Sequence, residues 1–354
     1  MCAVEWKKLG DVCEIKTGKG ITTKDCCDNG QYPIISGGVT PMGMYHQFNR
    51  KANTITISRV GANAGFVNFV TQDFYLNDKC FSVIQFDDAI STIDVKYLFF
   101  KLKSIEEEII SLQSEGGVPT INTTKVGNLT IPIPSLAKQQ EIVSQLDTFT
   151  TLISNLESEL DMRRKQYEHY RNQLLNFEGV EGVEWKKIES IAEIGTGSSN
   201  TKDELDNGLY PFFVRSQQVR WQNKYEYDET AIITSGDGVG VGKIFHYIEG
   251  KYALHQRAYR IHILDTGVVP KYVYNYMKCK FYDYIMMNAF SSSVTSVRRP
   301  MLLNFEVPIP LPKTQQEIVE KLDAFEQLIQ SLETEIKLRK QQYEYYREKL
   351  LTFD

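Results

Sequence analysis

The sequence lacks a long hydrophobic run and any cysteine arrangement typical of a metal site. No apolar stretch approaches the roughly 18 residues of a membrane span, and residues 1–6 show no signal-peptide pattern. The six cysteines form no Cys-x-x-Cys pair and have no histidines at metal-ligand spacing. We therefore expect a cytoplasmic protein with reduced cysteines, no bound metal and no membrane partner.

Motifs of catalysis are missing as well. The sequence has no Asn/Asp-Pro-Pro-aromatic tetrapeptide of a methyltransferase, no Walker loop of a helicase and no paired acids with a lysine of a nuclease. The glycine cluster at 236–243 fits neither dinucleotide nor P-loop spacing, and the segment after it resembles a strand rather than the helix that a phosphate site needs. We predict a turn there, and no catalytic residue or cofactor in this chain.

The chain also lacks an excess of basic residues. It has 40 Lys and Arg against 45 Asp and Glu, a net charge of −5, whereas affinity for nucleic acids depends largely on cations at phosphates. The acidic excess lies mainly in segments 136–182 and 312–354, and segments 1–135 and 183–311 are close to neutral. These globular segments can therefore still present a basic face to DNA.

What the sequence does contain is an internal repeat over its whole length. A motif that opens Pro-Ile-Pro and continues to Gln-Gln-Glu-Ile-Val occurs at 132–143 and again at 308–319, and Val-Glu-Trp-Lys-Lys at 4–8 returns at 183–187. A sequence repeated in this way points to two equivalent tasks or one symmetric partner. We predict a globular domain at 1–134, a long helix at 135–178, a second globular domain at 179–312 and a second long helix at 313–354.

Apolar residues follow a heptad pattern in both helical segments. Their alternating steps of four and three form the narrow seam of a coiled coil rather than the wider face of an ordinary surface helix. The predicted seam residues are Ile142, Leu146, Phe149, Ile153, Leu156 and Leu160, followed by Ile318, Leu322, Phe325, Ile329, Leu332 and Ile336. Arg163 and Arg339 interrupt the two seams, either by snorkelling to solvent or by marking a meeting point with a partner. The heptads leave open whether each helix pairs within the chain or with another chain.

The globular segments have the pattern of mixed α+β domains. β-branched runs at 52–58, 80–84, 229–234 and 259–263 predict strands, and aromatic-rich segments at 95–111 and 270–288 predict helices. The prolines before each long helix predict an extended entry. The predicted helix boundaries are a Ser135 N-cap, a capping box from Thr314 to Glu317, and an end of the first long helix at Gly179 and Gly182.

Polar side chains suited to reading DNA gather in both globular segments. Arginine pairs with guanine, and glutamine or asparagine with adenine, through two hydrogen bonds, and each such bidentate pair gives about 1–3 kcal/mol of discrimination. A solvated loop is the simpler interpretation of any one of these residues, but the clusters as groups favour DNA contact. The candidates are Arg59, Asn63 and Lys79 (with Asn77 nearby), and Arg215, Gln217, Gln218, Arg220, Lys243, Gln256, Arg257, Arg298 and Arg299.

The arrangement of these motifs resembles the specificity (S) subunit of type I restriction-modification systems. The resemblance spans the whole chain and rests on the repeated Trp-Lys-Lys start, β-rich segment, Pro-x-Pro entry with Gln-Gln-Glu-Ile-Val, and long helix. The segments at 210–218 and 236–243 also look like parts of the family's recognition domains.

This resemblance implies a fold and a role. Each β-rich segment would be a target-recognition domain for one half of a bipartite double-stranded DNA sequence, and the helices would form an antiparallel intramolecular coiled coil with pseudo-twofold symmetry. Two methyltransferase subunits and ATP-driven restriction subunits would be the partners. They would carry S-adenosylmethionine, ATP and Mg²⁺, so that this chain itself would not be an enzyme.

Two other classes of function compete with this interpretation. The first is a single-chain DNA methyltransferase or nuclease, against which the missing catalytic motifs argue. The second is a structural coiled-coil adaptor with no DNA role, which the repeated β-rich segments disfavour. Methyl transfer by the isolated chain would support the first, and absence of salt-dependent DNA binding would support the second.

Overall fold

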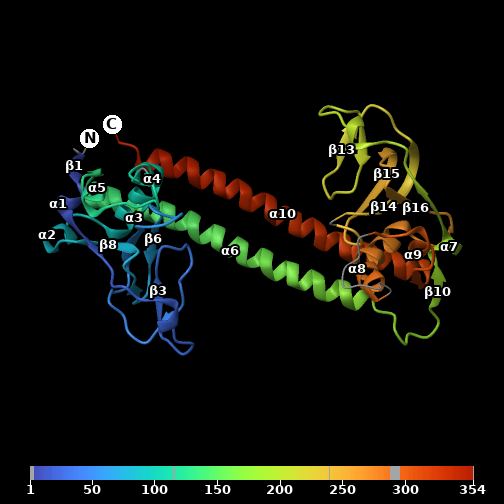
Figure 1. Cartoon of the computed structure of the whole chain (residues 1–354), viewed down its shortest axis with the longest axis horizontal. Helices are drawn as coiled ribbons and strands as arrows, with labels where there is room; N and C mark the ends of the chain where they lie inside the picture. Colours follow the sequence, from blue (N-terminus) through green and yellow to red (C-terminus); the bar gives the residue numbers. More distant parts are fainter. Residues whose placement is uncertain (1–3, 115, 239, 288–295, 354) are drawn as a thin grey trace. The chain divides into compact units, whose positions relative to one another are not determined.

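The computed structural model describes residues 4–114, 116–238, 240–287 and 296–353 (Figure 1). The chain divides into two compact units: the first unit is Met1–Glu157 with Thr334–Asp354, and the second unit is Ser158–Glu333. Each long helix contributes to both units, so each unit contains one globular part and a piece of each helix.

The first unit has three small sheets. Its main sheet is antiparallel with strand order β2-β8-β5-β6, a second sheet has the order β4-β3-β7, and β1 pairs with β9. The strands are β1 (Glu5–Lys8), β2 (Cys13–Thr17), β3 (Tyr32–Ile35), β4 (Met44–Tyr45), β5 (Thr54–Ser58), β6 (Val67–Val70), β7 (Tyr75–Leu76), β8 (Cys80–Gln85) and β9 (Thr130–Ile133). The β-branched run at β5 is central to the main sheet because its side chains from Ile55 to Ser58 are buried.

Short helices cover this sheet. They are α1 (Leu9–Val12), α2 (Asp87–Ile90), α3 (Val95–Ser104), α4 (Glu106–Ser111) and α5 (Thr123–Gly127). The core places Leu98 and Leu102 of α3 against Ile55, Ile57 and Phe81 of the sheet. The side chain of Asp94 caps the start of α3 by accepting hydrogen bonds from the backbone N–H groups of Lys96 and Tyr97. The segment 95–111, which was predicted as one helix, forms the two helices α3 and α4.

The second unit joins the corresponding strands into one six-stranded sheet. Its order is β11-β16-β14-β15-β12-β13, and β10 pairs with β17 beside it. The strands are β10 (Glu184–Lys187), β11 (Ala192–Thr196), β12 (Tyr210–Phe213), β13 (Arg220–Gln222), β14 (Tyr227–Ser235), β15 (Phe245–Leu254), β16 (Ala258–Ile263) and β17 (Glu306–Ile309). The predicted strands are confirmed in both units, and the glycine-rich cluster lies between β14 and β15 as expected for a turn.

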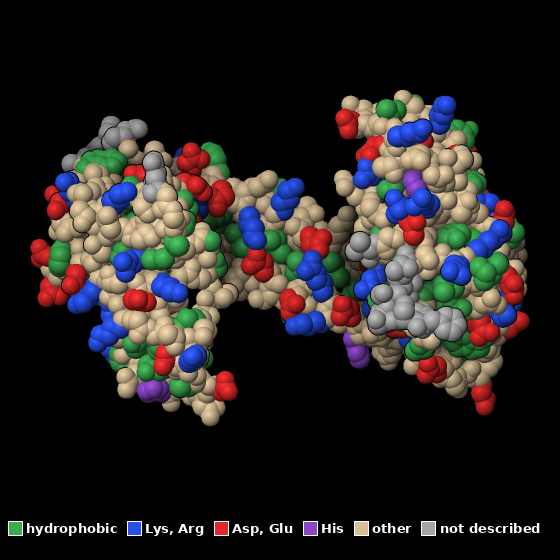
Figure 2. All heavy atoms as spheres, in the orientation of Figure 1, with side chains coloured by type: hydrophobic (Ala, Val, Ile, Leu, Met, Phe, Trp, Pro, Cys, Tyr) green, Lys and Arg blue, Asp and Glu red, His purple; other side chains and the backbone are tan. Residues whose placement is uncertain are grey.

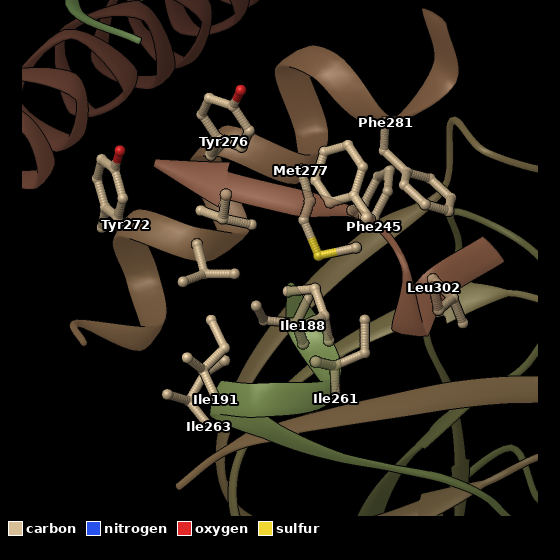
Figure 3. Close-up of a cluster of buried hydrophobic side chains, with 14 of the residues drawn as sticks. Ile188, Ile191, Phe245, Ile261, Ile263, Tyr272, Tyr276, Met277, Phe281 and Leu302 are labelled. Atoms are coloured by element: carbon tan, nitrogen blue, oxygen red, sulfur yellow. The ribbon is translucent and has the colours of Figure 1, made fainter. Parts of the chain in front are cut away.

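Helix α8 (Pro270–Met287) covers the sheet of the second unit, together with α7 (Ile188–Ile191) and α9 (Arg299–Leu303). Figure 3 shows Met277 of α8 pointing toward Ile188 of α7, and Tyr272 and Ile261 belong to the same core cluster. All four of these side chains are fully buried. The end of the predicted helix at residue 288 lies outside the described residues.

The long helices are α6 (Leu136–Leu174) and α10 (Pro312–Leu351). In the first unit Phe149 of α6 stacks on Tyr346 near the end of α10, with ring centroids 5.4 Å apart. In the second unit Tyr170 near the end of α6 stacks on Phe325 of α10 at 5.5 Å. The start of each helix thus packs on the end of the other, which is an antiparallel pairing within the chain.

Two of the predicted seam residues, Phe149 and Phe325, make these ring contacts between the helices. Each of the twelve side chains is buried or half-buried, from Ile142 to Leu160 and from Ile318 to Ile336. Arg163 bonds Glu159 and Gln166, and Arg339 bonds Glu335 and Gln342. In both cases the partners lie on the arginine's own helix. Both arginines therefore snorkel along the helix surface.

A buried glutamine ties each long helix to its globular part. Gln139 donates from Nε2 to the carbonyls of Thr92 and Pro134 at 2.9 and 2.8 Å and accepts from Asp94 N–H at 2.8 Å. Gln315 makes the same three contacts in the second unit, with Gly267, Pro310 and Val269. Both side chains are fully buried. The first glutamine of the repeated Gln-Gln-Glu motif is therefore a structural clamp.

Two predicted helix boundaries are wrong. Helix α10 begins at Pro312, so Thr314 lies inside its first turn and does not cap it. Proline suits this first position because its missing N–H would have no partner there anyway. Helix α6 ends at Leu174, well before Gly179 and Gly182, whose φ angles of 72° and 78° instead shape the linker that follows.

Candidate nucleic-acid interface

In the first unit, the predicted residues meet where strands β3, β5 and β7 end. Arg59 follows β5; its backbone N–H donates to Lys79 O at 2.8 Å and its Nη1 donates to Asp78 O at 3.1 Å. Asn63 donates from Nδ2 to Gly37 O at 3.1 Å. The structure thus brings Arg59, Asn63 and Lys79 together in one group, in which Asn63 and Lys79 are exposed and Arg59 is half-buried.

The second unit builds a corresponding group from three strand ends. Arg215 follows β12, Asp237 follows β14, and Arg257 lies between β15 and β16. Arg215 Nη1 is 2.7 Å from Asp237 Oδ1, and Arg257 Nη1 is 3.4 Å from Asp237 Oδ2. The two arginine side chains remain 38% and 60% exposed, so both are available to a ligand. We refer to Arg215, Asp237 and Arg257 as the arginine pair site.

The backbone shows that the two groups occupy equivalent places. Arg59 N donates to Lys79 O at 2.8 Å, and Gly236 N donates to Arg257 O at 2.9 Å. Ile121 N donates to Arg59 O at 2.9 Å, and Val297 N donates to Gly236 O at 2.8 Å. Arg59 and Lys79 therefore correspond in position to Gly236 and Arg257, and Asp237 corresponds to Val60.

The other predicted residues of the second unit lie in different settings. Arg220 on β13 is ion-paired with Glu204, and Arg299 donates to Ile194 O at 3.0 Å. Lys243 lies 4.2 Å from the centre of the Tyr282 ring. Gln217, Gln218, Gln256 and Arg298 are exposed. Gln256 is next to Arg257 and Arg298 is next to Val297, both of which make the equivalent backbone hydrogen bonds. Arg220 and Arg299 are bound by other groups of the protein.

One residue of the first unit has a structural role. Asn77 is only 1% exposed; its Nδ2 donates to Ile21 O at 2.7 Å and its Oδ1 accepts from Lys79 N at 3.0 Å. Its side chain therefore shapes the turn that presents Lys79, and it has no free group for a base.

The arginine pair site stays charged on both sides. The hydrogen bond from Arg215, together with the charges of both arginines, holds the pKa of Asp237 below its usual value. Burial, with a smaller contribution from the same two arginines, lowers the pKa of His255, whose Nδ1 accepts the Arg257 N–H at 3.0 Å. The local net charge is therefore one positive unit, carried by two arginines with a carboxylate between them.

Asp237 was missed in the sequence because a search for DNA contacts looks for cations and amides. A signal was present: it lies between Gly236 and Gly238 at the end of a β-branched strand. Gly238 has a φ of 97°, a conformation that glycine adopts readily. On the faces shown in Figure 2, basic side chains lie among acidic ones in both units, so an interface here depends on specific groups rather than on a large positive field.

Within the residues that the structure describes, no three His, Cys, Asp or Glu side chains form a group that could hold a metal ion. Nor does any helix in the described ranges combine the length and apolar character needed to cross a membrane.

Comparisons with known proteins agree with the repeat. The family model for the type I restriction modification DNA specificity domain matches twice, at residues 3–162 and 180–339. The Escherichia coli EcoR124I/EcoR124II type I restriction enzyme specificity subunit is 29% identical, over 99% of this chain and 94% of the relative. A putative type I specificity subunit of Mycoplasma pneumoniae is 27% identical, over 97% and 96% of the two chains.

Solved structures share the fold. A type I restriction-modification S subunit from M. genitalium superposes with a TM-score of 0.75 at 17% identity, over 100% of this chain and 97% of the other. A chain from a study of type I R-M complex assembly and conformational transition gives a TM-score of 0.61 at 14% identity, over 100% and 99%. The twofold match of the specificity domain, supported by this shared fold, shows that the chain belongs to the family of type I restriction-modification DNA specificity proteins.

Proposed function

We propose that this chain is the non-catalytic specificity subunit of a type I restriction-modification complex, in which segments 1–134 and 179–312 each recognise one half of a bipartite DNA sequence. The observation that carries this proposal is the equivalent strand-end site in the two units. One backbone framework presents Arg59 and Lys79 in the first unit and Gly236 and Arg257 in the second, where Asp237 joins Arg257 to Arg215. Equal scaffolds with unequal side chains fit two equivalent tasks on two different half-sites.

Base recognition follows from the donors at these sites. A guanidinium can donate two parallel hydrogen bonds to guanine O6 and N7, while a lysine ammonium is a point charge without that fixed geometry. The second site offers two guanidinium groups, and the first offers one beside an ammonium and the exposed Asn63. The two half-sites should accordingly differ in sequence.

The long helices would set the separation of the half-sites. Segments 135–178 and 313–354 contain the paired helices, and their antiparallel packing orients each globular part by the same contacts, including Gln139 and Gln315. At 1.5 Å per residue, a helix of about 40 residues is on the order of 60 Å long. Helix length would then determine the number of unread base pairs.

Partner subunits would supply the chemistry. We expect two methyltransferase subunits that bind S-adenosylmethionine, and restriction subunits that use ATP and Mg²⁺, working on double-stranded DNA in the cytoplasm. The repeat supports two equivalent docking sites for the methyltransferases. In the second unit, a groove of about 650 Å³ between the end of α6 and the start of α10 is lined by Tyr170, Phe177, Ile318 and Phe325, and would accept an apolar partner element.

Deleting one heptad from each long helix tests the spacer role. Removing residues 153–159 and 329–335 keeps the seam in register, and seven residues correspond to about 10 Å, or about three base pairs at 3.4 Å each. Methylated adenines mapped in a host that carries the assembled complex should show both half-sites unchanged and the gap shortened by about three base pairs. An unchanged gap would contradict the spacer role.

The same mapping separates this proposal from its rivals. The wild-type complex should methylate one bipartite sequence, and the isolated chain with labelled S-adenosylmethionine should transfer no methyl group. Methyl transfer by the isolated chain would favour the single-chain enzyme. An assembled complex whose methylation pattern does not change when this chain is replaced by a relative would favour a purely structural adaptor.

A further inference from the structure

The carboxylate of Asp237 contacts both arginines of the arginine pair site. Its two oxygens are divided between them, Oδ1 to Arg215 at 2.7 Å and Oδ2 to Arg257 at 3.4 Å. The three residues come from three separate strand ends, so the carboxylate links parts of the sheet that are far apart in sequence. Asp237 is itself 29% exposed in its side chain, which places it at the surface with the arginines.

The backbone holds Asp237 in place independently of the arginines. The Ser235 hydroxyl donates to Asp237 O at 2.6 Å, and Asp237 forms a β-bridge with Ser296. The neighbouring Gly236 is bonded on both sides, through its N–H to Arg257 O and through its carbonyl to Val297 N. Asp237 is therefore a fixed point to which two longer and more flexible side chains are attached.

We propose that Asp237 is a specificity-determining positioning residue, which holds Arg215 and Arg257 in the orientation that reads base edges and keeps them from binding phosphates indiscriminately. This inference rests on the proposed function of the second unit. Asp237 need not contact DNA for this role; it acts through the two arginines.

Two physical effects lead to this assignment. Each arginine uses one Nη group on Asp237 and keeps other N–H donors of its planar fork for a base, so the carboxylate reduces the rotamer freedom that would otherwise be lost on binding. The negative charge also reduces the local charge from two positive units to one, which weakens attraction to phosphates of any sequence. The first effect favours the correct sequence and the second disfavours all others.

The first unit provides an internal comparison. Val60 occupies the place of Asp237, forming a β-bridge with Thr120 where Asp237 bridges to Ser296. Strand β3 pairs with β7 in the same parallel register as β12 pairs with β15. Gly37, which follows β3, therefore lies where the second unit has Arg215. A carboxylate is thus present in the unit with two clustered arginines and absent from the equivalent position in the other.

The test uses the full chain assembled with the methyltransferase subunits of its own system. Binding of wild type, D237N and R257A is measured over a range of salt concentrations on two duplexes: one with the sequence that methylation mapping identifies, and one with the second unit's half-site scrambled. For D237N we expect affinity for the identified site to fall about tenfold, affinity for the scrambled duplex to rise about threefold, and the salt slope to steepen by about one counterion. R257A should weaken binding to both duplexes.

The control variant is D265N, which neutralises another ion-paired carboxylate of the second unit; Asp265 is bonded to Lys186 at 3.1 Å and follows β16, whereas Arg257 precedes that strand. It should leave both affinities as in wild type. Equal loss of affinity on both duplexes for D237N would indicate a merely structural role and overturn the inference, as would wild-type behaviour. If the wild-type complex itself does not distinguish the duplexes, the proposed function fails instead.

Discussion

The two globular parts share a backbone plan but differ in how their strands join. In the second unit β15 runs from Phe245 to Leu254 and links β14 with β12 in one six-stranded sheet. In the first unit the equivalent chain is interrupted between β6 and β7, so that two smaller sheets result. The strand-end site nevertheless has the same backbone hydrogen bonds in both. The recognition framework is therefore less variable than the sheet that supports it.

The shared clamp is where the largest effect is expected. Replacing Gln315 by alanine leaves the Val269 N–H and the Gly267 and Pro310 carbonyls without partners in a buried junction. We expect the free energy of unfolding to fall by about 3 kcal/mol, measured by chemical denaturation. Gln139→Ala should have a similar effect in the first unit.

The adjacent glutamines are matched controls. Gln140 and Gln316 are exposed neighbours of the clamp residues on the same helices. Alanine at either should change the free energy of unfolding by less than about 0.5 kcal/mol. A comparable loss for clamp and control variants would show that helix propensity, not the buried hydrogen bonds, is responsible.

The stability of the second unit's sheet should depend on a buried ion pair, whereas that of the first unit's main sheet should not. Arg260 of β16 is only 8% exposed and bonds Glu229 and Glu193 at 2.9 and 2.8 Å, whereas the equivalent residue of the first unit is the uncharged Ser82. Arg260→Ala should destabilise the second unit by about 2 kcal/mol because Glu229 loses its main partner. Ser82→Ala should cost about 1 kcal/mol, from the loss of hydrogen bonds with Arg50 and Lys16.

Thermal unfolding with a spectroscopic probe in each unit would compare these two variants. The difference between the sheets is confirmed if Arg260→Ala lowers only the transition of the second unit, and by more than Ser82→Ala lowers that of the first. Equal shifts would mean that the buried ion pairs contribute no more than a neutral hydrogen bond.

The last expected effect concerns sequence recognition alone and leaves stability unchanged. Arg59→Ala should relax the half-site of the first unit at one position, and Arg257→Ala that of the second, each by about 1–3 kcal/mol of discrimination. Mapping of methylated adenines checks this, because each variant has the unaltered half-site as its own control. If both variants relaxed the same half-site, the two units would not read separate half-sites.

The sequence predicted most of the architecture because the relevant patterns are local. Heptads identify the coiled coil without knowledge of its partner, and β-branched runs identify β5, β8, β14 and β16. The helix start at Pro312 was missed because Thr314 with Glu317 satisfies the capping pattern two residues later, and only the backbone path distinguishes them. The division of β6 from β7 was not anticipated, since strand continuity depends on tertiary pairing.

Prediction of the candidate site was less complete. Arg59, Lys79, Arg215 and Arg257 were selected by residue type, and the structure brings them to equivalent strand ends. The pairing of both arginines with Asp237 could not be predicted because it requires knowing that β12 and β14 both end beside the turn that leads into β16. The clamp was also missed: the Gln-Gln-Glu motif was recognised as a repeat signal, but the burial of Gln139 and Gln315 depends on the neighbouring loops.

The packing of Leu351 has a consequence for how the protein is made. This residue is 1% exposed and completes a cluster with Tyr97, Phe100, Ile142 and Leu146 of the first unit. During translation, the ribosome produces the whole second unit before it reaches Leu351. The apolar cluster around Tyr97 and Ile142 therefore stays incomplete until the last turns of α10 emerge. The main core of the first globular part, formed by residues between 9 and 133, contains no residue of α10, so its junction with the long helices is the last contact to form.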